Sequence, residues 1–490
     1  MEKIFSFDPN SPLLFTQFYF WAFFAIVYMI FALIGNKRLM RNAFLFFVSL
    51  FFYFKTSGFS LLILIFVTIS DFLIAKRISK AKKDGGKKAW LILSAVIDLS
   101  ILCYFKYAYF FADFIHNITG IEIKVVNIFS QLGNIIAGKE MFNVDAIVLP
   151  VGISFFIFQV ISCSVDVYRK EIEPVKNILD FGFYVSFFPQ LVAGPIVRYN
   201  SIAEDIYGRK VTAQGIEDGI FRFLIGLGKK VILANQLSEV SSTLLDGNLS
   251  ELSGLGALGG LLAFSLQIYF DFSGYSDMAI GIGKCLGFRF PENFNNPYCC
   301  SSVTDFWRRW HMTLGSFFRD YVYIPLGGNR KHQILNILIV WMLTGLWHGA
   351  YWNYVIWGLW FGLFLVIEKF TFLKWKRFPS ILTRIFSLVV VFLGWGIFYF
   401  EDFSKMKAFF NALLCSQADF SLDSTVLLNN GWLLLVALLF CLPVNEFAAK
   451  ISAPKWCTVT LKTIVSGLIL IVSAALLVGA TNNAFIYTRF

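Results

Sequence analysis

Charged residues are scarce in this 490-residue chain. They make up 15% of the sequence, whereas hydrophobic residues make up 57% and the mean hydropathy is +0.68. A soluble globular domain carries roughly 25% charged residues, so this chain lacks the polar side chains that would cover a surface in water. The scarcity of charge excludes an ordinary soluble enzyme and favours a membrane protein.

Sequence patterns for several kinds of site are also missing. The phosphate-binding pattern GxxxxGK[ST] and the nucleophile pattern GxSxG do not occur, and GIGKCLG (281–287) has no strand context for a dinucleotide fingerprint. The eight cysteines are scattered, without CxxC or Cys/His spacing. We therefore expect no metal ion and no tightly bound cofactor.

Long, nearly uncharged runs are what the sequence has instead. They cover residues 20–34, 61–74, 381–400, 431–442 and 464–478. A bilayer core of ~30 Å needs about 20 apolar residues per spanning helix. We predict an all-α polytopic protein of the cell membrane, with roughly ten or eleven transmembrane helices plus short and re-entrant helices.

Repeats and low-complexity linkers are absent from the sequence. We therefore predict a single integral-membrane domain over residues 1–490. Within it we expect N-terminal helices over 1–150, a core that carries the site over 150–380, and scaffold helices over 381–490. The start, MEKIFSFDPNSP, lacks the features of a cleaved signal, so we expect the first apolar run to be retained.

Basic residues cluster between the apolar runs, at 35–42, 75–88 and 374–377, and give a net charge of +11. Such clusters are typical of the cytoplasmic loops of membrane proteins. No aromatic stacking surface accompanies them, so we expect no nucleic-acid partner. If the first two clusters are both cytoplasmic, the apolar runs between them form a hairpin or a shallow re-entrant pair, and the N-terminus is extracytoplasmic.

Residues 180–330 interrupt the apolar pattern with glycines and polar clusters such as PENFNNPY. Irregular backbone at membrane depth is tolerated where it is buried in protein or lines a wet cavity, so we expect the site here. In QIYFDFSGYSDMAIG (267–281), Asp271 and Asp277 are ~600° apart on a helix and face different sides, and Gly274 suggests a break. These acids either belong to the site or hold the region together.

Four histidines occur in the chain. We expect His116 and His332 to be solvated, whereas His311 and His348 lie among tryptophans. An imidazole can accept or donate a proton near neutral pH; alternatively, each is a core residue hydrogen-bonded across helices. The tryptophans around His348 either pack the core or wall a tunnel for the acyl chain or thioester.

Two stretches, DFWRRWHMTLGSFFRDYVYIPLGGNR and LTGLWHGAYWNYVIWGLWFG, resemble the membrane-bound O-acyltransferase superfamily, specifically the bacterial branch with the membrane subunit of alginate O-acetyltransferase. PVGISFFIFQ, FPQLVAGPIVR, QIYFDFSGYSDMAIG and the final FIYTRF are similar to the same branch. The resemblance covers residues 150–490. It implies a ring of helices around a central tunnel.

The resemblance also implies a reaction. His348 matches the family's invariant histidine and His311 its second, Asn-or-His position. Donors in the superfamily are acyl thioesters, usually acyl-CoA, and acceptors are hydroxyls. In this branch the acceptor lies beyond the membrane, often with an SGNH-type partner that completes transfer to a polysaccharide.

We therefore predict an O-acetyltransferase that moves acetyl from cytoplasmic acetyl-CoA toward an alginate-like exopolysaccharide or cell-wall glycan. His348 is expected to be the general base, kept neutral by apolar walls, and His311 to orient the hydroxyl or stabilise the carbonyl oxygen. D-alanyl transfer to teichoic acid, a polysaccharide or lipid-linked-sugar transporter, and a non-catalytic scaffold remain as alternatives.

Four further residues are predicted to bind substrate: Trp307, Arg308, Arg319 and Trp347. CoA carries phosphates, with which arginine pairs in bidentate fashion. The alternative is that these arginines mark a cytoplasmic loop or pair with Asp305 and Asp320.

Overall fold

A computed structural model of the chain describes residue 7 and residues 13–140, 142–371, 379–415, 420–444 and 454–480. The regular structure in these ranges is helical. Within these ranges no β-strand occurs, and the predicted all-α fold class is confirmed. Most of the opening stretch MEKIFSFDPNSP, the basic cluster at 374–377 and the ending FIYTRF lie outside the described residues.

Seven helical stretches in these ranges are long and apolar enough to cross a membrane. They are Arg38–Lys80, Asp84–Thr119, Gly254–Cys285, Trp352–Phe370, Ser380–Tyr399, Asp423–Phe440 and Trp456–Leu477. The predicted count of ten or eleven is not confirmed. The runs on either side of Gly58 form one helical stretch. Other apolar helices are shorter: Phe18–Leu33, for example, has 16 residues, or about 24 Å, which is less than the thickness of the bilayer core.

The chain divides into two compact units. Among the described residues, the first takes in 39–192 and 349–351, and the second takes in 13–38, 193–348 and those from 352 onward. The prediction of one domain over the whole chain stays a prediction, as does the ring of helices around a tunnel.

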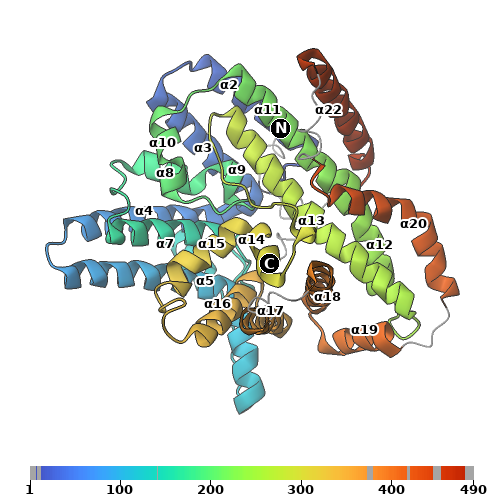
Figure 1. Cartoon of the computed structure of the whole chain (residues 1–490). Helices are drawn as coiled ribbons and strands as arrows, with labels where there is room; N and C mark the ends of the chain where they lie inside the picture. The colour runs from blue at the N-terminus through green and yellow to red at the C-terminus, as the bar shows by residue number, and fades with distance from the viewer. Residues whose placement is uncertain are drawn as a thin grey trace. The chain divides into compact units, whose positions relative to one another are not determined.

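The described part of the first unit contains eight helical elements: α3 (Arg38–Ser57), η1 (Gly58–Ser60), α4 (Leu61–Lys80), α5 (Asp84–Thr119), α6 (Ile128–Ala137), α7 (Ile153–Arg169), α8 (Ile178–Ser186) and α9 (Phe188–Leu191). Helix α4 packs against α5, α7 and α8 (Figure 1). Gly58, with φ +57°, turns the chain between α3 and α4. The predicted hairpin or shallow re-entrant pair between the first two basic clusters stays a prediction.

Buried polar side chains join three helices of this unit. Ser94 of α5 and Ser164 of α7 both donate to Asp71 of α4, at 2.6 and 3.2 Å. Asp98 of α5 lies within 3.5 Å of the Ser94 hydroxyl. All four side chains are buried, and hydrogen bonds offset the cost of burying them.

The remaining helices of the described residues belong to the second unit: α2 (Phe18–Leu33), α10 (Tyr199–Gly208), α11 (Ala213–Gly228), η2 (Lys229–Ala234), α12 (Asn235–Leu245), α13 (Gly254–Cys285), η3 (Pro297–Cys299), α14 (Val303–Arg309), α15 (Met312–Phe318), η4 (Arg319–Tyr323), α16 (Gln333–His348), α17 (Trp352–Phe370), α18 (Ser380–Tyr399), α19 (Phe403–Cys415), α20 (Ser421–Phe440) and α22 (Lys455–Leu477). Helix α13 lies beside α11 and α12 (Figure 1) and also packs against α18, α19 and α20. Its apolar span is mostly buried, whereas very little of the apolar span of α22 is buried.

Glycines let α11 and α13 pack backbone against backbone. A Cβ added at Gly226 would lie 2.5 Å from the carbonyl oxygen of Gly274, and one added at Gly281 would lie 2.6 Å from that of Gly219. The two pairs are seven residues apart on each helix, so they meet on one face of an antiparallel pair. Small residues commonly allow this close approach between membrane helices.

Ion pairs hold the same helices together. Asp277 of α13 pairs with Arg222 and Lys229 at 2.6 and 2.7 Å, and Asp271 pairs with Lys230 at 2.6 Å. The structure therefore favours the reading in which these acids hold the region together. The expected helix break near them is wrong, because α13 is continuous; the irregularity lies in its neighbour, where η2 widens into a π-helix.

The predicted irregular segment, 180–330, is confirmed in part. It contains short helices of four to ten residues, among them α9, α10, α14 and α15, and a second π-helical turn, η4. Polar groups within it, including Asn293 in PENFNNPY, are fully buried. The long regular helix α13 was not expected there.

Candidate active site

His348 is the last residue of α16, and close packing of α16 on α17 fixes its position. A Cβ at Gly345 would collide with the carbonyl oxygen of Tyr354, and one at Gly358 would collide with that of Trp341. The backbones of the two helices are therefore in direct contact. This contact holds the end of α16 against the first turns of α17.

Aromatic rings surround the His348 imidazole. Its centroid lies 5.0 Å from the ring of Trp347, 4.9 Å from that of Trp357 and 5.5 Å from that of Phe398, all at steep angles of 81–83°. The side chain is 2% exposed. The apolar surroundings predicted from the sequence are present.

His311 lies between α14 and α15 in a left-handed backbone conformation, with φ +42°. That conformation is uncommon for residues other than glycine, although asparagine, aspartate and histidine adopt it several times more often than the rest. It is held by main-chain hydrogen bonds on both sides: Met312 N–H donates to the carbonyl oxygen of Asn293, and Asn295 N–H donates to that of Arg309, both at 2.9 Å.

The side chain of Asn293 contacts the His311 ring directly. Its Oδ1 lies 3.0 Å from Nδ1 of His311 and also accepts hydrogen bonds from the backbone N–H and the hydroxyl of Thr313, at 3.3 and 2.8 Å. Its amide group donates to Ser276 at 3.1 Å. Burial lowers the pKa of His311 to about 3, so the ring is neutral at physiological pH.

The rings of both histidines lie beside the indole of Trp347. The ring of Trp347 lies 5.6 Å from that of His311 and 5.0 Å from that of His348. Trp307 is one ring further away: its indole lies 5.6 Å from that of Trp357, which itself contacts His348. The structure thus brings His311, His348 and Trp347 together, with Trp307 beside them.

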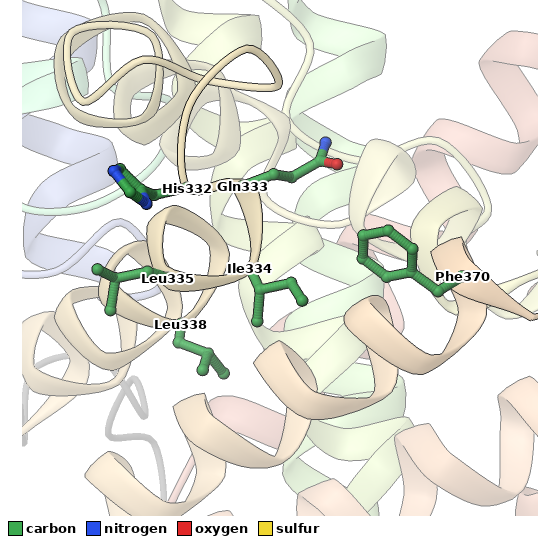
Figure 2. Close-up of a pocket in the computed structure, with 6 residues that line it drawn as sticks. All are labelled: His332, Gln333, Ile334, Leu335, Leu338 and Phe370. Carbon is green, nitrogen blue, oxygen red and sulfur yellow. The ribbon is translucent and has the colours of Figure 1, made fainter.

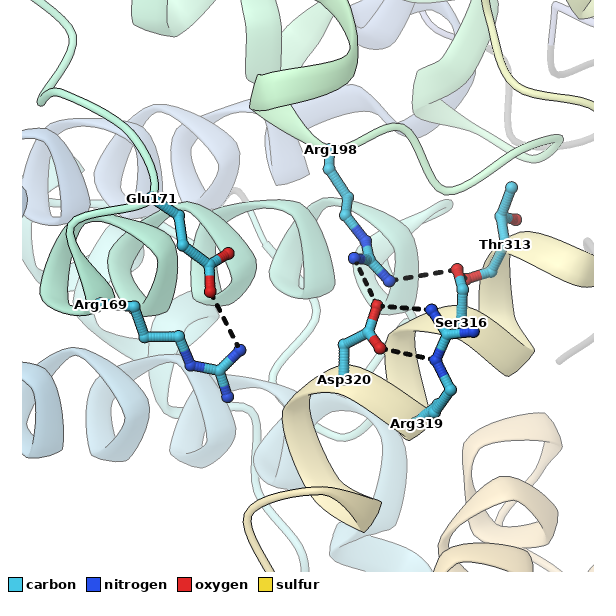
Figure 3. Close-up of polar contacts among 7 residues, drawn as sticks. All are labelled: Arg169, Glu171, Arg198, Thr313, Ser316, Arg319 and Asp320. Carbon is cyan, nitrogen blue, oxygen red and sulfur yellow. Dashed lines mark hydrogen bonds and ion pairs between the residues drawn. The ribbon is translucent and has the colours of Figure 1, made fainter. Parts of the chain in front are cut away.

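The two predicted arginines lie in other surroundings. Arg308 is exposed. Arg319 is 63% exposed and forms a two-pronged pair with Asp320, which also accepts a hydrogen bond from Arg198 (Figure 3). Burial alone would raise the pKa of Asp320, but hydrogen bonds from Arg319 and Arg198 bring it below its usual value. Arg319 therefore pairs with Asp320, which was the alternative expected from the sequence.

Arg309, a neighbour in the same segment, pairs with Asp305 at 3.0 Å. Of the three arginines between 308 and 319, only Arg308 has no ion pair among the described residues. It is thus the cation of this segment best placed to meet an added anion.

Glu368 is a site residue that the sequence analysis missed. This buried carboxylate of α17 accepts hydrogen bonds from the backbone N–H groups of Val303 and Thr304, at 2.9 and 2.8 Å, and from the Thr304 hydroxyl. It therefore caps α14, the seven-residue helix that carries Trp307. The signal was present: Glu368 is the one acid in the apolar α17 sequence.

Asn293 was missed as well, although the polar cluster PENFNNPY was noted. The two remaining histidines, His116 and His332, are exposed as predicted. His332 borders an open hollow of about 500 Å³ with Ile334, Leu338 and Phe370 (Figure 2). This hollow lies at the first turns of α16, whereas His348 is at its last residue, about 15 Å along the helix from Leu338.

Comparison with known proteins decides the family. The family model described as MBOAT, membrane-bound O-acyltransferase family, matches residues 99–401. The chain belongs to this family. The match begins before residue 150, so the N-terminal region shares more with the family than the resemblance indicated.

Three relatives show which members of this acyltransferase family the chain is similar to. The chain is 40% identical to the probable alginate O-acetylase of Azotobacter vinelandii over 69% of its own length and 65% of the relative's, just under two thirds. It is 32% identical to the peptidoglycan O-acetyltransferase of Helicobacter pylori over 79% and 76% of the two chains. It is 31% identical to the teichoic acid D-alanyltransferase of Bacillus subtilis over 51% and 69%.

These relatives confirm the predicted resemblance to the alginate O-acetyltransferase branch. The predicted enzyme class, O-acyltransferase, is that of the family and of all three relatives. Apolar helices and family together make the chain a multi-pass membrane protein.

Proposed function

We propose that this chain transfers an acetyl group from acetyl-CoA, a cytoplasmic thioester, to a hydroxyl group on the way to an extracytoplasmic polysaccharide. The observation that carries the proposal is the pair of buried imidazoles on one indole, Trp347. The names of the alginate and peptidoglycan relatives support an alginate-like exopolysaccharide or a cell-wall glycan as the acceptor.

In the proposed reaction His348 is the general base. It takes the proton of the acceptor hydroxyl as that oxygen attacks the thioester carbonyl. The new C–O bond forms, the C–S bond breaks, and the thiolate of CoA leaves and takes up the proton from His348. General-base assistance of this kind contributes roughly 10²–10⁴-fold to the rate. His311 acts on the hydroxyl or on the carbonyl oxygen, and Trp307 and Trp347 wall the reacting groups.

The donor and the orientation in the membrane are parts of the same proposal. Arg308 would meet the phosphates of CoA on the cytoplasmic side, with a smaller contribution from Arg319 because it also pairs with Asp320. The basic clusters at 35–42 and 75–88 would face the cytoplasm, with the N-terminus outside. A single cysteine placed at Lys83 should resist a membrane-impermeant thiol label in intact cells. Ready labelling there would reverse the orientation.

A partner completes the proposed pathway. The acetyl group would pass to an SGNH-type extracytoplasmic protein that transfers it to the polysaccharide, while membrane lipid surrounds the apolar helices. D-alanyl transfer to teichoic acid is the second candidate, because the Bacillus subtilis relative is a D-alanyltransferase. Its similarity covers only half of this chain, which favours acetyl transfer.

The test uses the purified full chain in lipid, given acetyl-CoA labelled in the acetyl group, with and without an SGNH-type protein and polysaccharide. We expect release of free CoA thiol together with transfer of label, and loss of both in His348→Ala. A D-alanyl thioester of a carrier protein serves as the competing donor, and its preferred use would support the second candidate. Polysaccharide movement across vesicles without thioester cleavage would replace both proposals with a transporter.

A further inference from the structure

We infer that Asn293 is a positioning residue that holds His311 in the tautomer with its hydrogen on Nδ1, so that neutral His311 meets substrate as a hydrogen-bond acceptor at Nε2. This inference rests on the proposed function for its chemical meaning, but the tautomer itself is a property of the protein alone. It decides between the two roles left open for His311.

The first step identifies the atom of Asn293 that faces the ring. The amide oxygen and nitrogen of asparagine are told apart by the groups that they meet. The backbone N–H of Thr313 can only donate, and it points at the same side-chain atom of Asn293, 3.3 Å away. That atom is therefore the oxygen, and the amide nitrogen is the one that reaches Ser276 at 3.1 Å.

The second step follows from the first. Nδ1 of His311 lies 3.0 Å from this oxygen. An amide oxygen has no hydrogen to give, so the hydrogen in the bond belongs to Nδ1. In a neutral imidazole the other nitrogen then carries the lone pair.

The third step concerns the charge of the ring. His311 is 1% exposed, and the ring of Phe272 lies 4.6 Å from it, edge to face. These surroundings disfavour imidazolium. The partner is also an amide rather than a carboxylate, so it orients the ring without adding the negative charge that would stabilise the protonated form.

The chemical consequence is a choice of role. A neutral imidazole whose one N–H is bonded to Asn293 has no N–H left for a developing oxyanion, and Nε2 can only accept. His311 therefore accepts a hydrogen bond from a hydroxyl of the acceptor next to the attacking one, whose own hydrogen goes to His348, and so orients the attacking oxygen toward the thioester carbonyl. The donor to the carbonyl oxygen must be another group.

Nitrogen-15 NMR of the full chain in lipid tests the tautomer directly. The chain has four histidines, so ¹⁵N-histidine labelling gives few resonances, and His311→Gln identifies those of His311. We expect the hydrogen on Nδ1 in the wild-type protein. A hydrogen on Nε2 would overturn the inference, whatever the activity of the protein.

Variants then connect the tautomer to the reaction. Asn293→Ala removes the acceptor oxygen, so the hydrogen should shift toward Nε2 and kcat should fall. By analogy with the partners that orient metal-binding histidines, the fall should be roughly 10–100-fold, with little change in KM for acetyl-CoA. Asn293→Asp keeps an oxygen at the same place and should retain the Nδ1–H tautomer. Ser276→Ala, which leaves that oxygen intact, is the matched control and should change kcat much less.

The outcomes are separable. An Asn293→Ala protein that keeps hydrogen on Nδ1 would remove Asn293 as the positioning residue. A shifted tautomer with unchanged kcat would remove His311 from the hydroxyl-binding role. If wild-type NMR shows Nδ1–H but the protein cleaves no thioester, the proposed function fails while the tautomer assignment stands.

Discussion

The two buried histidines are held by different means. His311 is held by hydrogen bonds: Asn293 reaches its ring and the residues that follow it. His348 sits among the edges and faces of Trp347, Trp357 and Phe398, at the end of a helix packed backbone to backbone on its neighbour. Ring contacts fix the place of an imidazole without choosing which nitrogen carries hydrogen, whereas an amide oxygen makes that choice.

This difference suits the two proposed roles. A group that takes up and releases a proton must change its protonation during the reaction, and apolar walls keep it neutral until the hydroxyl is bound while they exclude water. A group that holds a hydroxyl in one direction benefits from a fixed tautomer. The predictions below test the comparison from the largest expected effect to the smallest.

His348→Ala should give the largest effect. It removes the proposed base, so turnover should fall roughly 10²–10⁴-fold while the protein still folds and binds donor. Acetyl transfer and thermal stability should be measured on the same preparation, with His332→Ala, a change at an exposed histidine, as the control. Wild-type turnover per folded molecule in His348→Ala would end the catalytic assignment.

Substitutions at His311 should have smaller and graded effects. His311→Asn keeps an acceptor oxygen and suits the left-handed backbone at φ +42°, so it should retain more activity than His311→Ala, by roughly tenfold if one hydrogen bond to a charged or reacting group is lost in the alanine variant. His311→Gly separates backbone strain from chemistry, because it relieves strain without a side chain. If the glycine variant matches the asparagine variant in kcat, the side chain has no role in the reaction.

The sequence alone predicted the class of fold and the tryptophan-rich surroundings of His311 and His348, but not how the two histidines are held. The scarcity of charge and the length of the apolar runs indicate an all-helical membrane protein, and both are properties of single segments. Asn293 and Glu368 act across 18 and 65 residues of chain, on His311 and on Val303. Such contacts depend on how helices pack, which periodicity does not encode.

The same limit explains the wrong expectation of a break in α13. Gly274 reads as a helix breaker when the sequence is taken by itself. In the structure it is a contact point for the backbone of α11, and the helix around it is continuous. Only the neighbouring helix distinguishes the two meanings.

Glu368→Gln tests a second buried side chain that, like Asn293, holds part of the site by hydrogen bonds. Val303 N–H donates to one carboxylate oxygen and Thr304 N–H to the other, so a glutamine can serve only one and turns its NH₂ toward the second donor. We expect a loss of about 1–3 kcal/mol in the free energy of unfolding, the cost of a buried unsatisfied group, seen as a lower Tm. Glu239→Gln, at an exposed position of α12, should leave Tm unchanged; equal Tm values for the two variants would refute the capping role.

Arg308 and Arg319 should differ in their effect on donor binding. Arg308→Gln should raise the apparent KM for acetyl-CoA by roughly tenfold, the value of one charge-assisted hydrogen bond. Arg319→Gln should raise it less, because Arg319 already pairs with Asp320. Unchanged KM in both variants would place the donor phosphates elsewhere.

The smallest expected effect concerns pH. Burial lowers the pKa of His311 to about 3, so this ring does not gain a proton in the folded protein as pH falls from 7 to 5. The acidic limb of kcat in that range must therefore belong to another group and should be the same in the wild type and in His311→Asn. A limb that disappears in His311→Asn would show that His311 titrates there and would contradict its neutral, accepting role.

The glycine contacts between α11 and α13 also fix the number of residues between successive contact points on each helix. Gly219 contacts Gly281 and Gly226 contacts Gly274, so the two contact points must be seven residues apart on both helices. Inserting one residue between Gly219 and Gly226 would rotate one contact by about 100° relative to the other and would turn Arg222 or Lys229 away from Asp277. We therefore expect length variation among relatives to fall outside these two heptads, even where the side chains between the glycines differ.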